Sequence, residues 1–134
     1  MILLGEQSVE VDGPGSGAYN ASLESYFAQQ QSSLHPACIV SPQSVQGVSV
    51  AVKYLTEAGH NCLFAVRSGG HTSWAGASNI AGGIVIDLRA LNTIELNANQ
   101  SIVSVGVGAS WDTVYEKLDP LGLGVNGGRA AGVG

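Results

Sequence analysis

Apolar residues in the middle of the chain follow a helical period between two short apolar runs. Four of them recur three or four positions apart: Val45, Val48, Val52 and Leu55. This spacing predicts a helix with one buried face, with Ser44 as its N-cap and Gly59 as its stop. The runs 37–40 and 62–66 predict buried strands. Residues 37–66 therefore predict a parallel strand–helix–strand unit.

The pattern before residue 37 is weaker. Residues 6–18 are polar and glycine-rich, which predicts an exposed lead-in. A short helix is predicted over 20–31, and its apolar face carries three residues: Leu23, Tyr26 and Phe27. Residues 1–35 are accordingly interpreted as an N-terminal lead-in with one short helix.

The pattern changes in the second half of the chain. Residues 83–88 predict a strand, and residues 93–97 and 101–107 predict a hairpin. Ser110 is a candidate N-cap for a last helix that ends before Gly122. Its apolar positions are Trp111, Val114, Tyr115 and Leu118. The predicted class is α+β, with a small parallel part, antiparallel strands and a helix.

Composition and charge narrow the classes of function. The chain has 134 residues, of which 45% are hydrophobic, 11% are charged and 19 are glycine. This combination suits one domain of strands joined by tight backbone loops. The formal net charge of -5 disfavours a nucleic-acid partner, which would require clustered lysine and arginine. No stretch is long and apolar enough to predict a membrane span.

The sequence alone does not determine the cellular compartment. The sequence has two Asn-x-Ser sequons, at Asn20 and Asn99. Secretion is therefore possible, but residues 1–5 are too short to be a signal peptide. Cys38 and Cys62 are either two buried thiols or a disulfide. Two cysteines alone do not make a structural zinc site, which needs four ligands.

The segment after the second predicted strand carries the candidate chemistry. Gly69 and Gly70 are adjacent, so the backbone can adopt positive φ and turn successive amides toward one point. Such a nest can hold a phosphate or pyrophosphate, and hydroxyl side chains at Ser68, Thr72 and Ser73 flank it. A plain turn is the alternative. Neither the G-x-G-x-x-G fingerprint after a strand nor a Walker loop is found.

Other polar and aromatic residues have simpler interpretations. Asp87 and Arg89 are predicted to form a local salt bridge at a strand end. His35 and His60 are predicted to be solvated. Trp74 and Trp111 could flank a ring, but the helical spacing of Trp111 favours core packing.

The string from Ala65 to His71 resembles the flavin-attachment loop of the PCMH-type FAD-binding family, the relatives of vanillyl-alcohol oxidase and p-cresol methylhydroxylase. The fungal berberine-bridge-enzyme-like oxidases are the most similar members. The resemblance extends over residues 36–134. Its further segments are 36–40, 83–88 with Leu91 and Asn92, 105–109, Trp111 with Tyr115, 127–129 and 132–134.

This resemblance implies FAD as the cofactor. The backbone from Arg67 to His71 would wrap the FAD pyrophosphate, and Thr72 and Ser73 would add donors. The His71 ring nitrogen would be joined to the 8α-methyl carbon of the flavin. A second loop would pass beside the isoalloxazine and pyrophosphate, through Gly128, Gly132, Val133 and Gly134. Because Ala130 stands where bicovalent relatives have cysteine, at most one covalent bond is expected.

The resemblance also implies an extent and a reaction. Residues 36–134 would be an incomplete PCMH-type FAD-binding domain, with no substrate domain and no catalytic base. The parent would be an oxidoreductase that transfers a hydride from a small-molecule C–H bond to the flavin, which dioxygen reoxidises. The alternative is a non-catalytic, truncated or degenerate paralogue that binds FAD weakly or not at all.

Overall fold

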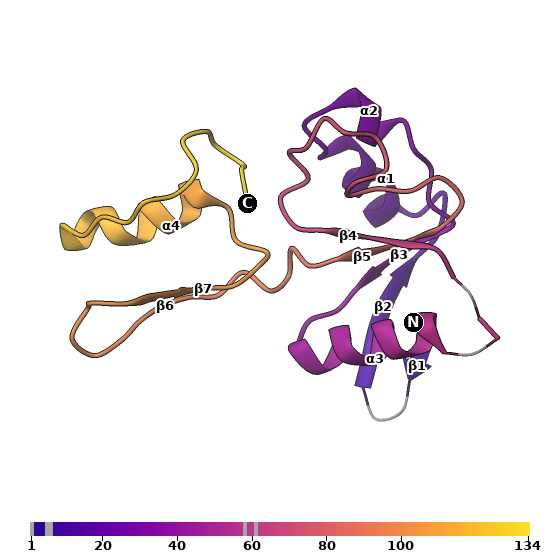
Figure 1. The fold of residues 1–134 in the computed structure, drawn as a ribbon, viewed down its shortest axis with the longest axis horizontal. Coiled ribbons are helices and arrows are strands. Elements are labelled where there is room, and N and C mark those ends of the chain that lie inside the picture. Colours follow the sequence, from indigo (N-terminus) through magenta and orange to yellow (C-terminus); the bar gives the residue numbers. More distant parts are fainter. Residues whose placement is uncertain (1, 5–6, 58, 61) are drawn as a thin grey trace.

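The main part of the molecule has three layers, with a mixed sheet between helices (Figure 1). The computed structural model describes residues 2–4, 7–57, 59–60 and 62–134. The strand order in the five-stranded sheet is β1-β2-β3-β5-β4. The strands are β1 (Ile2–Leu4), β2 (Gln7–Asp12), β3 (Cys38–Ser41), β4 (Phe64–Arg67) and β5 (Ile84–Asp87).

Helices cover both faces of this sheet. Helices α1 (Gly17–Glu24) and α2 (Gln29–Ser32) lie over one face, and α3 (Val45–Thr56) lies over the other (Figure 1). Side chains alternate between the faces, as the pleat of a strand requires. Ile39 packs toward α1 with Tyr19, whereas Val40 packs toward α3 with Ala51.

The predicted parallel unit is confirmed, with one difference in strand order. Ser44 caps α3, because its Oγ accepts a hydrogen bond from the Gly47 amide at 3.0 Å. Strands β3 and β4 each pair in parallel with β5, which lies between them. The chain therefore leaves β4 through a long loop and returns as β5 into the space between two earlier strands.

The prediction of an exposed lead-in over 6–18 is wrong for Gln7–Asp12. These residues form β2, which pairs antiparallel with β3, and β1 pairs antiparallel with β2. Val9 is 1% exposed and packs with Val40 and Ala51. The valines at positions 9 and 11 alternate with polar residues, which is the pattern of a strand with one buried face. The polar, glycine-rich composition of residues 6–18 as a whole does not reveal this pattern.

The single helix predicted over 20–31 is also wrong. It is divided into α1 and α2 by residues 25–28. Leu23 and Tyr26 are buried as predicted, but Phe27 is 70% exposed. Ser25 is the C-cap of α1, and its Oγ accepts hydrogen bonds from two arginines, which fix the break.

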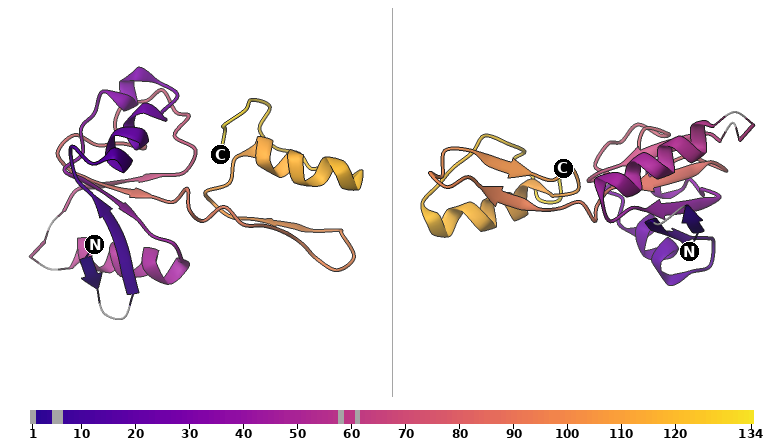
Figure 2. Two further views of the ribbon diagram at one scale, coloured as in Figure 1. Left: turned by 180° about the vertical axis from the view of Figure 1, so that it is seen from behind. Right: turned by 90° about the horizontal axis from the view of Figure 1, so that it is seen from below.

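The predicted hairpin and last helix are confirmed. Strands β6 (Ile94–Leu96) and β7 (Val103–Val105) pair antiparallel. They lie beside α4 (Trp111–Leu118), away from the main sheet (Figures 1 and 2). Val114 and Leu118 are buried. The Ser110 hydroxyl makes no capping hydrogen bond, contrary to prediction. The 3-10 helix η1 (Asp119–Leu121) ends at Gly122, where φ is 67°.

The described residues also bear on the cysteines, on a membrane span and on a metal site. Cys38 and Cys62 are free thiols. No helix among the described residues combines the length and apolar character that a membrane crossing needs. In that same part of the chain, no three histidine, cysteine or acidic side chains come together as a metal site.

Candidate functional site

The two glycine loops predicted to act together meet at one cavity. It lies beyond the carboxyl end of β4 and has a volume of about 250 Å³. Its lining residues are Ser68, Gly69, Gly70, His71, Thr72, Ser78, Val133 and Gly134. All but Ser78 belong to the predicted set. Ligands of open α/β sheets bind at the carboxyl ends of parallel strands, and this cavity has that position.

The backbones of the two loops approach so closely that only glycine fits at Gly69. A Cβ there would lie 2.6 Å from the Gly134 nitrogen and 3.0 Å from the Gly132 oxygen. A Cβ on Gly134 would in turn lie 2.8 Å from the Gly69 nitrogen. Neighbouring backbone cannot move aside as a side-chain end can. The absence of side chains at both positions is therefore what lets the loops form one site.

The first loop presents unused backbone donors. Gly70 has φ 71°, in the left-handed region, and its carbonyl accepts a hydrogen bond from the Phe27 amide at 3.4 Å. Within the described part of the chain, the backbone N–H groups of residues 69–72 donate no hydrogen bond. Free amides grouped at a positive-φ turn form an anion-binding nest.

The predicted hydroxyl donors are only partly available. The Ser68 hydroxyl donates to the Val107 carbonyl and so ties the loop to the chain after β7. Thr72 Oγ1 accepts from the Trp74 amide at 3.2 Å, which leaves its own proton free. Ser73 is exposed and does not line the cavity.

His71 lies at the edge of the cavity, neither buried in apolar core nor fully exposed. Its ring stacks on Phe27, with centroids 4.3 Å apart and an interplanar angle of 15°. On another side, its Nε2 lies 3.3 Å from the position of a Cβ on Gly132. The imidazole is thus confined between an aromatic ring and the second glycine loop.

The Arg67 side chain does not line the cavity, although Arg67 was predicted as a binding residue. It is 1% exposed, and its Nη1 donates to the Ser22 carbonyl at 2.7 Å and to Ser22 Oγ at 3.0 Å. Nη2 donates to Ser25 Oγ at 2.9 Å, and the guanidinium lies 3.6 Å from the centre of the Tyr26 ring. Burial lowers the pKa of Arg67.

Ser78 is the lining residue that the sequence did not indicate. The Tyr26 hydroxyl donates to the Ser78 carbonyl at 2.7 Å, which fixes the backbone of the long loop. The Ser78 hydroxyl is buried and has no hydrogen-bond partner among the described residues. A buried polar group without a partner is uncommon and marks a place where a ligand could supply one. Its isolated position in a polar loop gives no sequence signal.

The buried state of Tyr26 predicts a loss of stability at alkaline pH. Burial raises the pKa of Tyr26 from 10.0 to about 12, while Arg67 opposes that rise. The unfolded chain therefore loses the phenol proton first. The contribution of Tyr26 is fully present below pH 10 and is lost as pH rises through about 12. We expect about 2 kcal/mol of the free energy of unfolding to be lost in this way.

Urea unfolding of wild type and Tyr26→Phe across pH 10 to 12 checks this expectation. Phenylalanine has no proton to lose, so the stability difference between the two proteins should shrink or reverse as the pH rises. Parallel stability curves over that interval would contradict the assignment.

Gly128 is near the second loop but does not reach the cavity. A Cβ on Gly128 would lie 2.7 Å from a Trp111 ring atom, and its carbonyl accepts from the Tyr115 hydroxyl at 2.8 Å. Trp111 is half-buried and packs on Gly128 rather than in the main core. The prediction for Trp111 was therefore right about packing and wrong about the partner.

The first turn of helix α4 anchors the second glycine loop. The Trp111 amide donates to the Val133 carbonyl at 2.8 Å, and the Gly132 amide donates to Asp112 Oδ1 at 3.0 Å. The Ser110 hydroxyl, followed by the Gly132 amide, holds the pKa of Asp112 below its usual range. Asp112 therefore positions a cavity loop.

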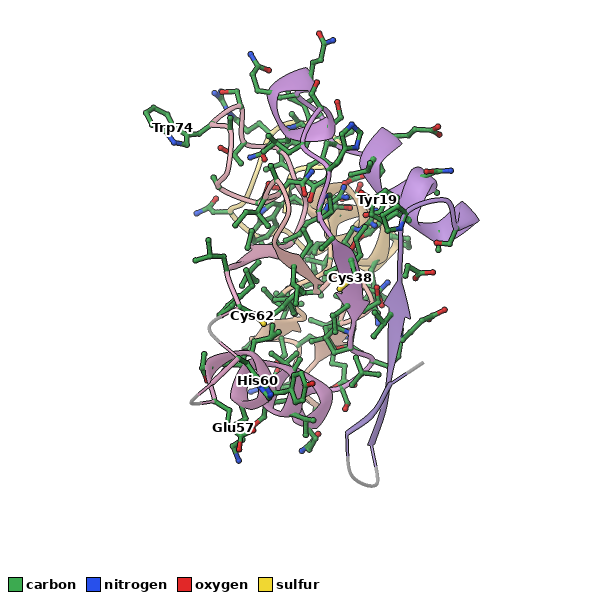
Figure 3. All side chains as sticks on the ribbon, turned by 90° about the vertical axis from the view of Figure 1, so that its right-hand side faces the viewer. Tyr19, Cys38, Glu57, His60, Cys62 and Trp74 are labelled. Carbon is green, nitrogen blue, oxygen red and sulfur yellow. The ribbon has the colours of Figure 1, made fainter. Side chains whose placement is uncertain are left out.

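The remaining candidates have no part in the cavity. Asp87 and Arg89 form the predicted local salt bridge, at 2.6 Å. His35 and His60 are exposed as predicted, and the His60 ring lies tilted against the Tyr54 ring. Trp74 is 77% exposed and projects outward (Figure 3).

A larger cavity, of about 490 Å³, lies at the opposite ends of β4 and β5. It is lined by Ala37, His60, Cys62, Leu63, Ala81, Gly82, Gly83 and Ile84. Apart from His60 and Cys62, this lining offers no chemically reactive side chain. The smaller cavity remains the candidate site because the two glycine loops meet there.

Known proteins resemble this chain over most of its length. Residues 36–133 match the family described as FAD binding domain. The FAD-dependent monooxygenase sdcF of Emericella nidulans is 47% identical over 121 residues, which cover 90% of this chain and 25% of that protein. The chain spans about a quarter of the length of this and two other FAD-dependent monooxygenases that it matches.

Solved structures have the same fold. The 6-hydroxy-D-nicotine oxidase of Arthrobacter nicotinovorans matches with a TM-score of 0.74 and 27% identity, over 90% of this chain and 25% of that one. A chitooligosaccharide oxidase matches with a TM-score of 0.75 and 26% identity, over 94% of this chain and 26% of that one.

Proposed function

Because the chain belongs to the FAD binding domain family of PCMH-type flavoproteins, we propose that its cavity holds the FAD diphosphate in an oxidoreductase. The observation that carries the proposal is the group of free backbone amides at residues 69–72. They lie beside the second glycine loop, which can approach so closely only because Gly69 has no side chain. Backbone donors are suited to phosphate oxygens, because they present fixed dipoles at short range.

The residues present fit a diphosphate. A cavity of about 250 Å³ is smaller than the sites of whole drug-sized ligands but large enough for a compact anion. Gly69 and Gly70 would supply amides from the first loop, with Val133 and Gly134 lining the opposite side. The Thr72 proton and the unpartnered Ser78 hydroxyl would complete the donor set.

Buried charge beneath the first loop also favours an anion. A Cβ on Gly70 would lie 2.9 Å from Arg67 Nε, which has no hydrogen-bond partner among the described residues. Arg89 is paired with Asp87, so the cluster of Arg67, Arg89 and Asp87 carries one net positive charge. That charge lies in a region of low dielectric, where its field on a nearby anion is strong.

We further propose that His71 carries the flavin through one ring nitrogen. The new N–C bond would replace a C–H bond of the 8α-methyl group. That hydrogen, the imidazole proton and two electrons would pass to the flavin, which dioxygen would reoxidise with release of hydrogen peroxide. The His71 ring borders the cavity and is held on two sides, so its orientation is restricted. Ala130 has no nucleophilic atom, so a single covalent bond is expected. When bound, the flavin would supply hydride-accepting chemistry, with dioxygen as the proposed reoxidant.

The substrate is proposed to be a small molecule whose binding residues lie outside these 134 residues. Among the described residues, the cavity lining includes no carboxylate or lysine that could take a proton from substrate. The relatives, a monooxygenase and two oxidases, support the reaction class, but their names give different substrates or none.

Replacement of His71 by alanine separates binding from attachment. Wild-type protein incubated with FAD and precipitated in acid should retain flavin fluorescence. His71→Ala should lose this acid-stable signal, yet bind dissociable FAD within about tenfold of wild type, because the amide donors remain. His60→Ala, which changes an exposed histidine elsewhere, is the matched control. Acid-stable flavin on His71→Ala would refute His71 as the attachment residue.

A further inference from the structure

Phe27 has an unusual environment for a large apolar side chain. It is 70% exposed, while Tyr19, Leu23 and Tyr26 just before it are buried. Its ring nevertheless has a specific partner, because it lies almost parallel to the His71 imidazole at 4.3 Å. Phe27 is not among the residues that line the cavity. Its contact is with the proposed attachment residue and not with the diphosphate cradle.

The break between α1 and α2 brings Phe27 to this place. A continuous helix would put Phe27 on the same face as Leu23, against the sheet. Instead Ser25 ends α1, and its Oγ accepts from Arg67 Nη2 at 2.9 Å and from Arg89 Nη1 at 2.8 Å. The Phe27 amide then donates to the Gly70 carbonyl at 3.4 Å. Arg67 and Arg89 therefore fix the backbone that directs Phe27 toward the glycine loop.

The stacked ring limits the orientations open to His71. A histidine in an exposed loop would exchange among staggered χ1 rotamers and a broad range of χ2. Here one face of the imidazole is covered by Phe27, and Nε2 lies close to the Gly132 backbone. A rotation that moved the ring away would lose the stacking contact.

We propose that Phe27 is a positioning residue for His71, which holds the imidazole in the orientation that flavin attachment requires. This inference rests on the proposed function. Covalent chemistry is sensitive to the alignment of the reacting atoms, and a displacement of about 1 Å can lower a rate about 100-fold. Phe27 should therefore control the rate of attachment but not the affinity for dissociable FAD.

Two measurements on Phe27→Leu test the inference. The first follows acid-stable flavin on the protein over time, and we expect the rate to fall at least about tenfold. Dissociable FAD affinity should stay within about threefold of wild type. The second records the carbon-bound ring protons of His71 by NMR without FAD. Leucine should remove the ring-current shift that Phe27 imposes on them, whereas Phe27→Tyr should preserve both the shift and the rate.

A matched control is provided by the contact between Tyr54 and His60. Their rings are tilted by 35° with centroids 4.4 Å apart, and neither residue lines the cavity. Tyr54→Leu should move the His60 resonances while leaving those of His71 and the attachment rate at wild-type values.

The outcomes distinguish the inference from the function on which it rests. Attachment to Phe27→Leu at the wild-type rate, or unchanged His71 resonances in that variant, overturns the role of Phe27 alone. If wild-type protein acquires no acid-stable flavin, the proposed attachment fails, and the positioning role fails with it. Slow attachment together with lost shifts, both restored by tyrosine, supports the inference.

Discussion

Gly69→Val is expected to abolish FAD binding while leaving the fold intact. A Cβ at residue 69 would lie 2.6 Å from the Gly134 nitrogen and 3.0 Å from the Gly132 oxygen. These are backbone atoms, so the second loop would have to move as a unit. The donors on the two sides of the cavity would then separate, and we expect affinity to fall at least about 100-fold, or roughly 2.7 kcal/mol.

Flavin fluorescence titration measures this loss, and Gly124→Val is its matched control. A Cβ at Gly124 would meet nothing within 4 Å, so that variant should bind FAD as wild type does. Circular dichroism should show the same secondary structure for all three proteins, because Gly69 lies in a loop after β4. Binding by Gly69→Val within a few-fold of wild type would mean that contact between the loops is not needed for the site.

Arg67→Met is expected to destabilise the whole domain. Its guanidinium joins β4 to the end of α1 by hydrogen bonds to Ser22 and Ser25 and lies on the Tyr26 ring. Methionine keeps much of the volume but none of the donors. Loss of charged, buried hydrogen bonds predicts a decrease of about 3–5 kcal/mol in the free energy of unfolding. That is a large share of the roughly 5–15 kcal/mol typical of a domain.

Chemical denaturation measures this effect, with Arg129→Met as the control because Arg129 is exposed. Arg67→Lys should lie between the two, since an ammonium keeps the charge but not the planar set of donors. A decrease below about 1 kcal/mol for Arg67→Met would show that the buried network contributes little net stability.

The periodic elements of the fold were predictable because burial imposes their spacing. The apolar face of α3, its Ser44 cap and the strands on both sides were all evident in the sequence. The insertion of β5 between β3 and β4 was not, because strand order depends on contacts between distant segments. Strand β2 was missed because its two valines lie among polar and glycine residues.

The candidate site was predictable in its backbone and less so in its side chains. Adjacent glycines require a special backbone, so Gly69 and Gly70 could be recognised directly. Arg67 was different. It shares a face of β4 with buried Ala65, and alternation along the strand already placed it toward α1. Its position beside the glycines predicted a contribution from its backbone, whereas its side chain binds Ser22 beneath the loop.

Phe27 and Ser78 lay beyond sequence reasoning for a related reason. Each reaches the site because a residue distant in sequence holds the backbone next to it. Ser25 and Arg67 fix the bend before Phe27, and Tyr26 holds the backbone at Ser78. A local sequence pattern does not reveal contacts between residues that are distant in sequence.

Peptide mapping of flavin-loaded protein tests the central claim most directly, that a cradle of backbone amides holds FAD so that His71 can bind it. Trypsin cleaves after Arg67 and Arg89, and the peptide between them contains His71 as its single histidine and no cysteine. After acid precipitation and digestion, the flavin should be found on this peptide, with fragmentation placing it on His71. Flavin on any other peptide, or a wild-type protein that releases all its flavin in acid, would contradict the account.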